Sequence, residues 1–263
     1  MLIDCNAYVG QWPFSQRRNN TCDGLLQRMN HFGVNISCIS NLNGIFYKNT
    51  QAANEELYEE IKSEKRFRDR LIPFAVINPI YNGWKHDVEI CHTEMGMKGI
   101  RLYPQYHGYE LTNPFCAELV KIARDRDLVV TFSLRMVDSR PSSWMDLPIK
   151  KEWTLKDIVP IIKEVPDARY LILNVANSTQ LSDEETALFN EAFTVMDTSG
   201  RAITNLGELL QIFGNDKFAF GSHTPILDNL TGLLRIESLR ESEADEPTKE
   251  LLRSGNIKRL LNL

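Results

Sequence analysis

The chain has 263 residues, close to the ~250 residues of a single α/β barrel. Its 30 basic and 35 acidic residues give a net charge of −5, which argues against nucleic acid or an anionic membrane as the main partner and leaves small anionic substrates open. Five cysteines without C-x-x-C spacing, no N-terminal signal pattern and no apolar run of about 18 residues predict a soluble protein of the reducing cytoplasm.

Short apolar runs rich in β-forming residues alternate with longer helical patterns along the whole chain. This alternation is typical of βαβ units and a parallel sheet. We expect eight strands, at Leu2–Asn6, Ile36–Asn41, Leu71–Ile77, Gly99–Tyr103, Val129–Leu134, Tyr170–Asn174, Thr194–Thr198 and Phe218–Gly221.

Capping residues mark where the helices between these strands begin and end. Thr21 begins one helix that stops at Gly33, and Asn113 precedes a proline suited to the first helical position. Further helices are expected to start at Thr154, with Asp157 in capping-box spacing, and at Thr204, and a last helix is expected at Thr248–Leu261.

Two predicted connections are longer than a barrel requires. They span residues 43–51, after the second strand, and 135–153, after the fifth. Both leave the carboxyl ends of strands, the face on which barrel active sites lie. No change in composition divides the chain, so we expect one distorted (β/α)₈ TIM-barrel domain over residues 1–263, with a C-terminal helix.

Several segments together resemble the amidohydrolase-related family, whose barrel holds one or two metal ions. The opening Ile3–Gly10 is similar to the family's strand-one motif I-D-x-H-x-H-x-G. Further similar segments follow in the family's order, at Asn54-Glu55, Arg70–Ala75, Asn78-Pro79, Gly96–Pro104, Asp197–Ser199, Phe220–Pro225 and Leu252–Leu261. The resemblance covers nearly the whole chain and implies a TIM-barrel hydrolase.

All five metal-binding positions that the resemblance implies carry other residues. Asn6 and Tyr8 replace the first histidine pair, Ser133 and Asn174 replace two later histidines, and His223 replaces an aspartate. Amide oxygens, hydroxyls and a phenol are poor zinc ligands. We therefore expect no metal cofactor, with zinc disfavoured, and a hydrolase of this kind would need another base and another means of stabilising an oxyanion.

His223 is the main candidate for a catalytic group, because an imidazole at the barrel mouth can exchange protons near neutral pH. It is expected to act as general base, with Tyr8, Asn6, Ser133 and Asn174 as donors to a developing oxyanion. The alternative is a polar plug in which these groups only bond one another.

Strand alternation makes two further predictions for the first strand. It places Asp4 on the face of Asn6 and Tyr8, where the carboxylate could orient Asn6 or His223. It turns Cys5 toward the helix layer, which makes that thiol a poor candidate nucleophile.

Substrate contacts are expected from five residues at the same end of the barrel. Arg101, Tyr103 and Arg135 suit a carboxylate or phosphate, although each arginine could instead pair with an acid such as Glu110 or Asp138. His107 is a second acid–base candidate or an exposed loop residue, and Trp12 either stacks on a substrate ring or caps the barrel.

Two functions remain open from the sequence. The first is a metal-independent enzyme that hydrolyses or isomerises a small carboxylate-bearing substrate, such as a sugar-acid lactone. The alternative is a pseudoenzyme that binds a metabolite or protein partner without turnover. A zinc hydrolase with unusual ligands is a third reading, and a homo-oligomer stays open.

Overall fold

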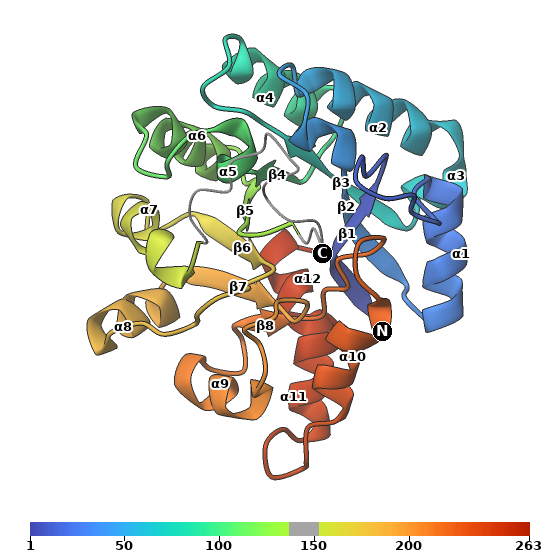
Figure 1. The fold of residues 1–263 in the computed structure, drawn as a ribbon. Coiled ribbons are helices and arrows are strands. Elements are labelled where there is room, and N and C mark those ends of the chain that lie inside the picture. Colours follow the sequence, from blue (N-terminus) through green and yellow to red (C-terminus); the bar gives the residue numbers. More distant parts are fainter. Residues whose placement is uncertain (137–152) are drawn as a thin grey trace.

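The computed structural model describes residues 1–136 and 153–263 and confirms the (β/α)₈ barrel (Figure 1). Eight parallel strands follow one another around the sheet in chain order: β1 (Ile3–Val9), β2 (Ile36–Asn41), β3 (Leu71–Val76), β4 (Gly99–Leu102), β5 (Val129–Ser133), β6 (Arg169–Leu173), β7 (Phe193–Asp197) and β8 (Phe218–Ala219). Backbone bonds from the Cys5 and Tyr8 amides to the Phe220 and Thr224 carbonyls, both 2.9 Å, close the ring between β8 and β1.

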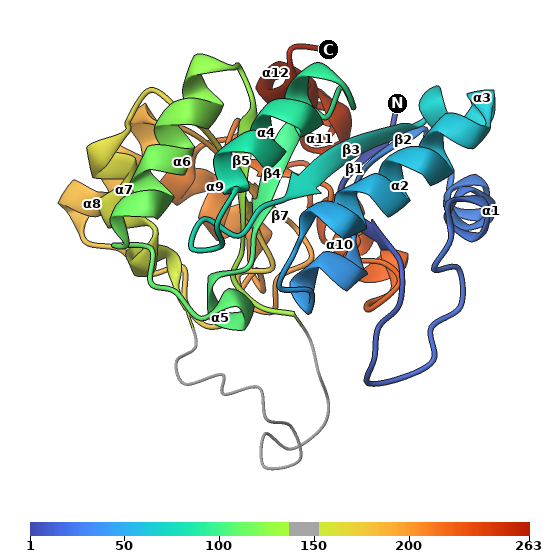
Figure 2. The ribbon, with the colours of Figure 1, turned by 90° about the horizontal axis from the view of Figure 1, so that it is seen from above.

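Helices form the outer layer around the strands. They are α1 (Cys22–Phe32), α2 (Gln51–Ser63), α3 (Lys65–Arg68), α4 (Trp84–Thr93), α5 (Pro104–His107), α6 (Pro114–Asp125), α7 (Val159–Glu164), α8 (Asp183–Glu191), α9 (Leu206–Phe213), α10 (Asn229–Glu237), α11 (Glu246–Glu250) and α12 (Asn256–Leu261). Two of them, α5 and α12, lie instead at the two ends of the barrel (Figure 2). Short 3₁₀ turns at Leu42–Ile45 and Leu155–Asp157 interrupt the loops after β2 and β5.

The predicted caps hold for three of the four helix starts. Thr21 accepts a hydrogen bond from the Gly24 amide, and Gly33 ends α1 with a φ of 69°. Asn113 caps α6, and Thr154 with Asp157 forms a capping box around the 3₁₀ turn. The predicted start at Thr204 was wrong, since α9 begins at Leu206 after Asn205.

The C-terminal helix differs from the single helix that was predicted. It begins at Glu246, where the Asp245 side chain accepts from the Thr248 amide, and a π-helical turn at Leu251–Gly255 separates α11 from α12. Ile257 and Leu260 of α12 pack with the inward residues of the strands, and α12 lies at the end of the barrel opposite α5 (Figure 2). The helix α12 therefore closes one end of the barrel, and a functional site is expected at the other end.

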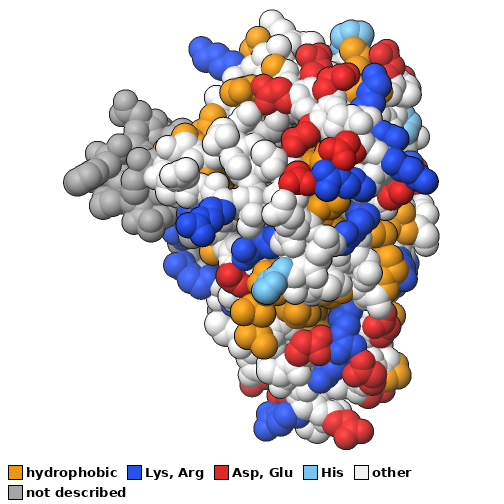
Figure 3. All heavy atoms as spheres, turned by 90° about the vertical axis from the view of Figure 1, so that its right-hand side faces the viewer, with side chains coloured by type: hydrophobic (Ala, Val, Ile, Leu, Met, Phe, Trp, Pro, Cys, Tyr) orange, Lys and Arg blue, Asp and Glu red, His pale blue; other side chains and the backbone are white. Residues whose placement is uncertain are grey.

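The outer surface carries no dominant charge on the face that Figure 3 shows, where acidic and basic side chains are intermingled. That mixture matches the small net charge of −5. In residues 1–136 and 153–263, none of the helices combines the length and hydropathy that a bilayer crossing requires.

Candidate functional site

A bulge in β1 decides which of its side chains enter the barrel. The register with β2 shifts between Asp4 and Ala7, so that the first strand carries one extra residue there. The prediction that Cys5 faces the helices was wrong: Cys5 packs inside the barrel against Cys38, and burial raises its pKa well above the ordinary thiol value. Beyond the bulge, which contains Cys5 and Asn6, Tyr8 also points inward.

Strand alternation had predicted that Asp4 could orient Asn6 or His223. The Asp4 carboxylate forms no hydrogen bond with the side chain of either residue. It accepts the Ser222 hydroxyl at 2.5 Å, the Ser222 amide at 2.9 Å and the Asn6 backbone amide at 3.0 Å. Burial raises the Asp4 pKa to about 6, against the lowering effect of these hydrogen bonds. Asp4 thus ties the bulge to the segment after β8.

The Asn6 amide nitrogen lies where β1, β7 and the segment after β8 meet. It donates to Asp197 Oδ2 at 2.7 Å and lies 3.1 Å from His223 Nδ1 and 3.3 Å from Ser199 Oγ. The opposite amide orientation would bring two acceptor oxygens to 2.7 Å of each other, so the nitrogen must face Asp197. Asn6 is therefore the donor that holds this cluster together.

Asp197, at the end of β7, is the acidic centre of the cluster and is fully buried. Its Oδ1 accepts the Asn174 backbone amide at 2.7 Å, and its Oδ2 accepts both Asn6 and the Ser199 hydroxyl. Burial raises the Asp197 pKa above the usual carboxyl value. A Cβ at Gly221 would lie 2.6 Å from Oδ2, so only glycine permits this close approach.

We did not predict Asp197 or Ser199 as site residues. The available signal was their position: an acid that closes a barrel strand, followed two residues later by a hydroxyl, at the face where such sites occur.

His223 lies in the cluster as predicted, but its geometry does not suit a general base. Because an amide nitrogen cannot accept, Asn6 donates to Nδ1, and the imidazole proton is therefore on Nε2. Burial, with a smaller effect of the Arg101 charge, lowers the His223 pKa to about 3, so the ring is neutral. Nε2 has no hydrogen-bond partner among the described residues, which makes it a free donor instead of a base.

Burial of a neutral His223 predicts sensitivity to acid. Its pKa is about 3 in the fold and near 6.5 unfolded, so only the unfolded chain takes up this proton as pH falls below 6.5. Between pH 6.5 and 5 this removes about 2 kcal/mol of stability, which is fully present above pH 6.5. Protonation of Asp4, whose pKa is about 6, stabilises the fold over the same range, so the effect of His223 appears as a difference between two curves. In urea unfolding the wild type should lose about 2 kcal/mol relative to His223→Gln as the pH falls to 5, and parallel curves would contradict the assignment.

Arg101, on β4, is completely buried. Its Nη1 donates to the Ala7 carbonyl at 3.4 Å, and its guanidinium lies 4.5 Å from the centre of the Tyr8 ring. Nε and Nη2 have no hydrogen-bond partner, and no acid within the described residues pairs with Arg101. The predicted alternative of a pair with Glu110 is thus wrong, whereas Asp138 lies outside the described residues.

Three predicted hydroxyls surround this arginine. Burial raises the pKa of Tyr8, an effect that the Arg101 charge and the Ser133 hydroxyl partly offset. Burial raises the pKa of Tyr103 well above its ordinary value, so both phenols are neutral donors. The Tyr103 and Ser133 hydroxyls have no well-formed hydrogen bond, while Tyr8 makes only a long one, 3.7 Å, to the Met136 sulfur.

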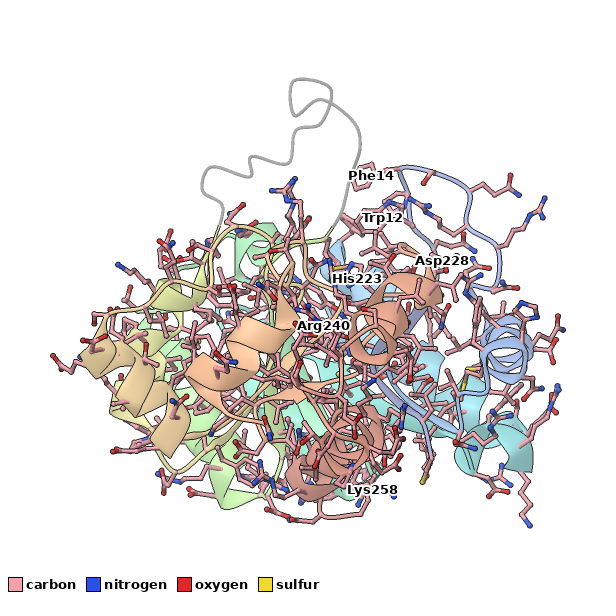
Figure 4. All side chains as sticks on the ribbon, turned by 90° about the horizontal axis from the view of Figure 1, so that it is seen from below. Trp12, Phe14, His223, Asp228, Arg240 and Lys258 are labelled. Atoms are coloured by element: carbon pink, nitrogen blue, oxygen red, sulfur yellow. The ribbon has the colours of Figure 1, made fainter. Side chains whose placement is uncertain are left out.

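An aromatic cap covers this part of the mouth. Trp12 packs on Phe14 and Phe46, with ring centres 5.1 and 5.7 Å apart, and Phe46 packs on Tyr106 at 6.1 Å. Trp12, Phe14 and His223 lie toward the same end of the barrel, far from Lys258 at the other (Figure 4). Trp12 therefore lies over the site that it was predicted to serve, and packing within the cap is the contact that it makes.

His107 connects two loops through a hydrogen bond. Its Nε2 donates to the Gly44 carbonyl at 3.0 Å, which joins the segments after β4 and β2. Burial lowers its pKa to about 4. A half-buried ring held in this way is not the exposed loop residue that was the alternative, and its acid–base role stays a prediction.

A cavity of about 310 Å³ opens beside the cluster. Its wall includes the cluster residues Asn174 and Ser199 together with the predicted Arg135. Asn174 closes β6 with a φ of 52°, a left-handed conformation that is costly outside glycine, and its buried Nδ2 has no partner. The cavity thus reaches Ser199, whose hydroxyl donates to Asp197.

No family model and no curated protein matches this sequence. Solved structures match over the whole chain. A 2,6-dihydroxybenzoate decarboxylase complexed with 2,6-dihydroxybenzoate has a TM-score of 0.73 and 15% identity, covering 100% of this chain and 99% of its own. A provisionally assigned amidohydrolase from Staphylococcus aureus has a TM-score of 0.72 and 18% identity, covering 100% and 99%.

A third similar structure is the 5-carboxyvanillate decarboxylase of Novosphingobium aromaticivorans. Its TM-score is 0.74 at 13% identity, covering 100% of this chain and 96% of its own, and it is complexed with manganese and 4-hydroxy-3-methoxy-5-nitrobenzoic acid. The chain shares their barrel. The resemblance to amidohydrolase-related proteins is therefore confirmed at the level of the fold.

The residues present here do not fit a metal of the kind bound in that structure. Both Asp197 oxygens already accept hydrogen bonds, and the group at their focus is an amide nitrogen, which cannot coordinate. His223 offers a protonated Nε2 instead of a lone pair. Within residues 1–136 and 153–263, no group of three or more His, Cys, Asp or Glu side chains could hold an ion.

Proposed function

We propose that this barrel is an enzyme that hydrolyses or isomerises a small carboxylate-bearing compound without a tightly bound metal. The observation that carries the proposal is Arg101, a buried cation with two unpartnered nitrogens and, among residues 1–136 and 153–263, no acid paired with it. Burying a charge without a counter-charge is costly, so a natural occupant is an anion. The carboxylate of the ligand supplies that charge, and Tyr103 and Ser133 supply further donors.

In the proposed chemistry, neutral hydrogen-bond donors stabilise the developing negative charge and one buried carboxylate accepts a proton. The His223 Nε2–H donates to a carbonyl oxygen as it becomes negative, since a neutral imidazole can stabilise an oxyanion without giving up its proton. Asp197 is the proton acceptor. A water in the cavity passes its proton to the Ser199 hydroxyl, which passes its own to Asp197 while the water oxygen attacks.

The test uses purified full-length protein, metal analysis and a substrate panel. The panel contains sugar-acid lactones and hydroxylated aromatic acids, assayed for ring opening, isomerisation and release of CO₂, before and after chelation. We expect turnover of a carboxylate-bearing member that chelation leaves unchanged, and less than stoichiometric metal. Stoichiometric zinc or manganese, with activity lost on chelation, would contradict the metal-free proposal.

A pseudoenzyme would give a different pattern. Carboxylates would raise the melting temperature, since any ligand of the native state stabilises it, but no panel member would turn over. That result would remove the catalytic part of the proposal and leave the binding part.

A further inference from the structure

A pair of hydrogen bonds from α10 holds the backbone on both sides of Ser199. Arg235, half-buried on α10, donates from Nη1 to the Thr198 carbonyl and, at 2.7 Å, to the Gly200 carbonyl. These two carbonyls belong to the residues that flank Ser199. The guanidinium therefore fixes the turn that directs the Ser199 hydroxyl to Asp197.

Close packing brings α10 against the ends of two strands. Gly232 lies three residues before Arg235, and a Cβ there would be 2.2 Å from the Gly221 carbonyl oxygen and 3.1 Å from Thr198 Oγ1. The same Thr198 hydroxyl accepts the Gly221 amide at 3.3 Å. Glycine at position 232 is therefore what allows α10 to carry Arg235 to the end of β7.

Asp197 lies among neutral hydrogen-bond donors. In residues 1–136 and 153–263, these donors are the Asn6 amide, the Ser199 hydroxyl and the Asn174 backbone amide. Burying a carboxylate without a counter-charge is costly, and a cation a few ångströms away favours its ionised form. A positive charge beyond these donors would therefore stabilise the ionised Asp197.

Arg235 is a cation that responds to this carboxylate. Burial lowers the Arg235 pKa, and the charge of Asp197 partly opposes that effect. On β1, burial raises the pKa of Asp4, Cys5 and Tyr8, and the same charge adds to all three shifts. No carboxylate in the described part of the chain forms an ion pair with Arg235, and its carbonyl contacts orient the guanidinium without neutralising it.

We infer that Arg235 is a positioning residue for the proposed proton acceptor: it aligns the Ser199 hydroxyl with Asp197, and its charge favours the ionised carboxylate. The inference rests on the proposed function, in which the Ser199 hydroxyl relays the proton of a water to Asp197. Such a relay requires an aligned hydroxyl and an ionised acceptor. Arg235 supplies both conditions and acts only through these two residues.

Urea unfolding from about pH 4 to 8 tests the electrostatic part without a substrate. Arg235→Gln removes the charge and makes ionised Asp197 more costly, so its loss of stability relative to the wild type should grow as pH rises through the Asp197 pKa. Arg235→Lys keeps the charge, and its loss should be the same at every pH. Asp4 and His223 also titrate, but they do so in every variant and cancel in the difference.

Arg70→Gln is the matched control. Arg70 is also half-buried and donates to the backbone carbonyls of Val34 and Asn35, but it precedes β3, at the amino ends of the strands. Its loss of stability should not vary with pH. A constant loss in Arg235→Gln like that of Arg70→Gln would overturn the inference, and so would a loss in Arg235→Lys that grows with pH.

Turnover separates the inference from the proposed function. With a substrate found by the panel, Arg235→Gln should lower kcat about tenfold with little change in KM, and move the acid limb of the pH profile upward by about one pH unit. Arg235→Lys should restore the wild-type profile. A wild type without turnover, together with a pH-dependent loss in Arg235→Gln, would remove the proposed catalysis and support the interaction of Arg235 with Asp197. Turnover with an unshifted profile in Arg235→Gln would overturn the inference and leave the proposed function intact.

Discussion

Replacing Arg101 with methionine is expected to abolish carboxylate binding and yet to stabilise the folded protein. A buried guanidinium that pairs with no acid in the described part of the chain has lost its hydration without full compensation, and its contact with the Tyr8 ring recovers only part of that cost. Methionine fills a similar volume without the charge. We expect the free energy of unfolding to rise by about 1–2 kcal/mol, as when buried charges are replaced by apolar side chains of similar size.

Arg169 offers a matched control, since it is also largely buried but fully engaged. It begins β6, donates to the Leu260 carbonyl at 2.7 Å and pairs with Asp127. Arg169→Met should therefore destabilise the protein, because it leaves these acceptors without their donor. Urea unfolding of both variants and calorimetry with acetate measure the two effects. Destabilisation of Arg101→Met to the same degree, with acetate binding intact, would show that Arg101 is structural.

A gain in stability with a loss of binding is the signature of a residue kept for function. It also separates this interpretation from the polar plug that the sequence left open. In a self-satisfied plug every group has a partner, whereas Nε and Nη2 of Arg101, the Tyr103 and Ser133 hydroxyls and the His223 Nε2 make no well-formed hydrogen bond within the described residues.

The fold could be predicted because strands and caps are local signals. The strand Ile36–Asn41 was predicted with the bounds that the structure shows, since turn residues mark both ends of a run of β-forming residues. The first strand was predicted to end at Asn6 but continues to Val9, and the bulge changes the side-chain alternation from which the faces of Asp4 and Cys5 were predicted. A bulge depends on the pairing strand and leaves little trace in its own sequence.

Asn6, Asn174 and His223 were predicted to lie together, since carboxyl ends of barrel strands converge, but Asp197 and Ser199 were missed. The roles of the side chains could not be predicted. The tautomer of His223 is set by Asn6, 217 positions away in the sequence, and the wall of the cavity includes Arg201 and Arg235, which reach it from a loop and a helix. Such contacts form only when the barrel closes, and no sequence motif marks the residues that make them.

The stability of the Asn6→Asp variant is expected to depend on a bound cation, whereas the stability of the wild type is not. The change removes the donor to Asp197 and places a carboxylate about where the amide nitrogen lay, 2.7 Å from Asp197 Oδ2. Two buried carboxylates at this distance cannot both ionise freely, so one pKa rises and stability falls as pH increases. At pH 7.5 we expect a loss of about 3–5 kcal/mol, the cost of an uncompensated buried charge.

Manganese should restore part of that loss in the variant alone. An ion that binds only the native state contributes about 2.7 kcal/mol at a concentration 100 times its Kd. Asn6→Leu is the matched control, because it also loses the donor but offers no ligand, so its destabilisation should be independent of manganese. Thermal and urea unfolding with chelator or with manganese measure these differences. Equal stabilisation of the wild type and Asn6→Asp by manganese would show that the cluster binds a cation while Asn6 is present. The interpretation that the Asn6 amide nitrogen occupies the position of a cation between Asp197 and His223 would then be wrong.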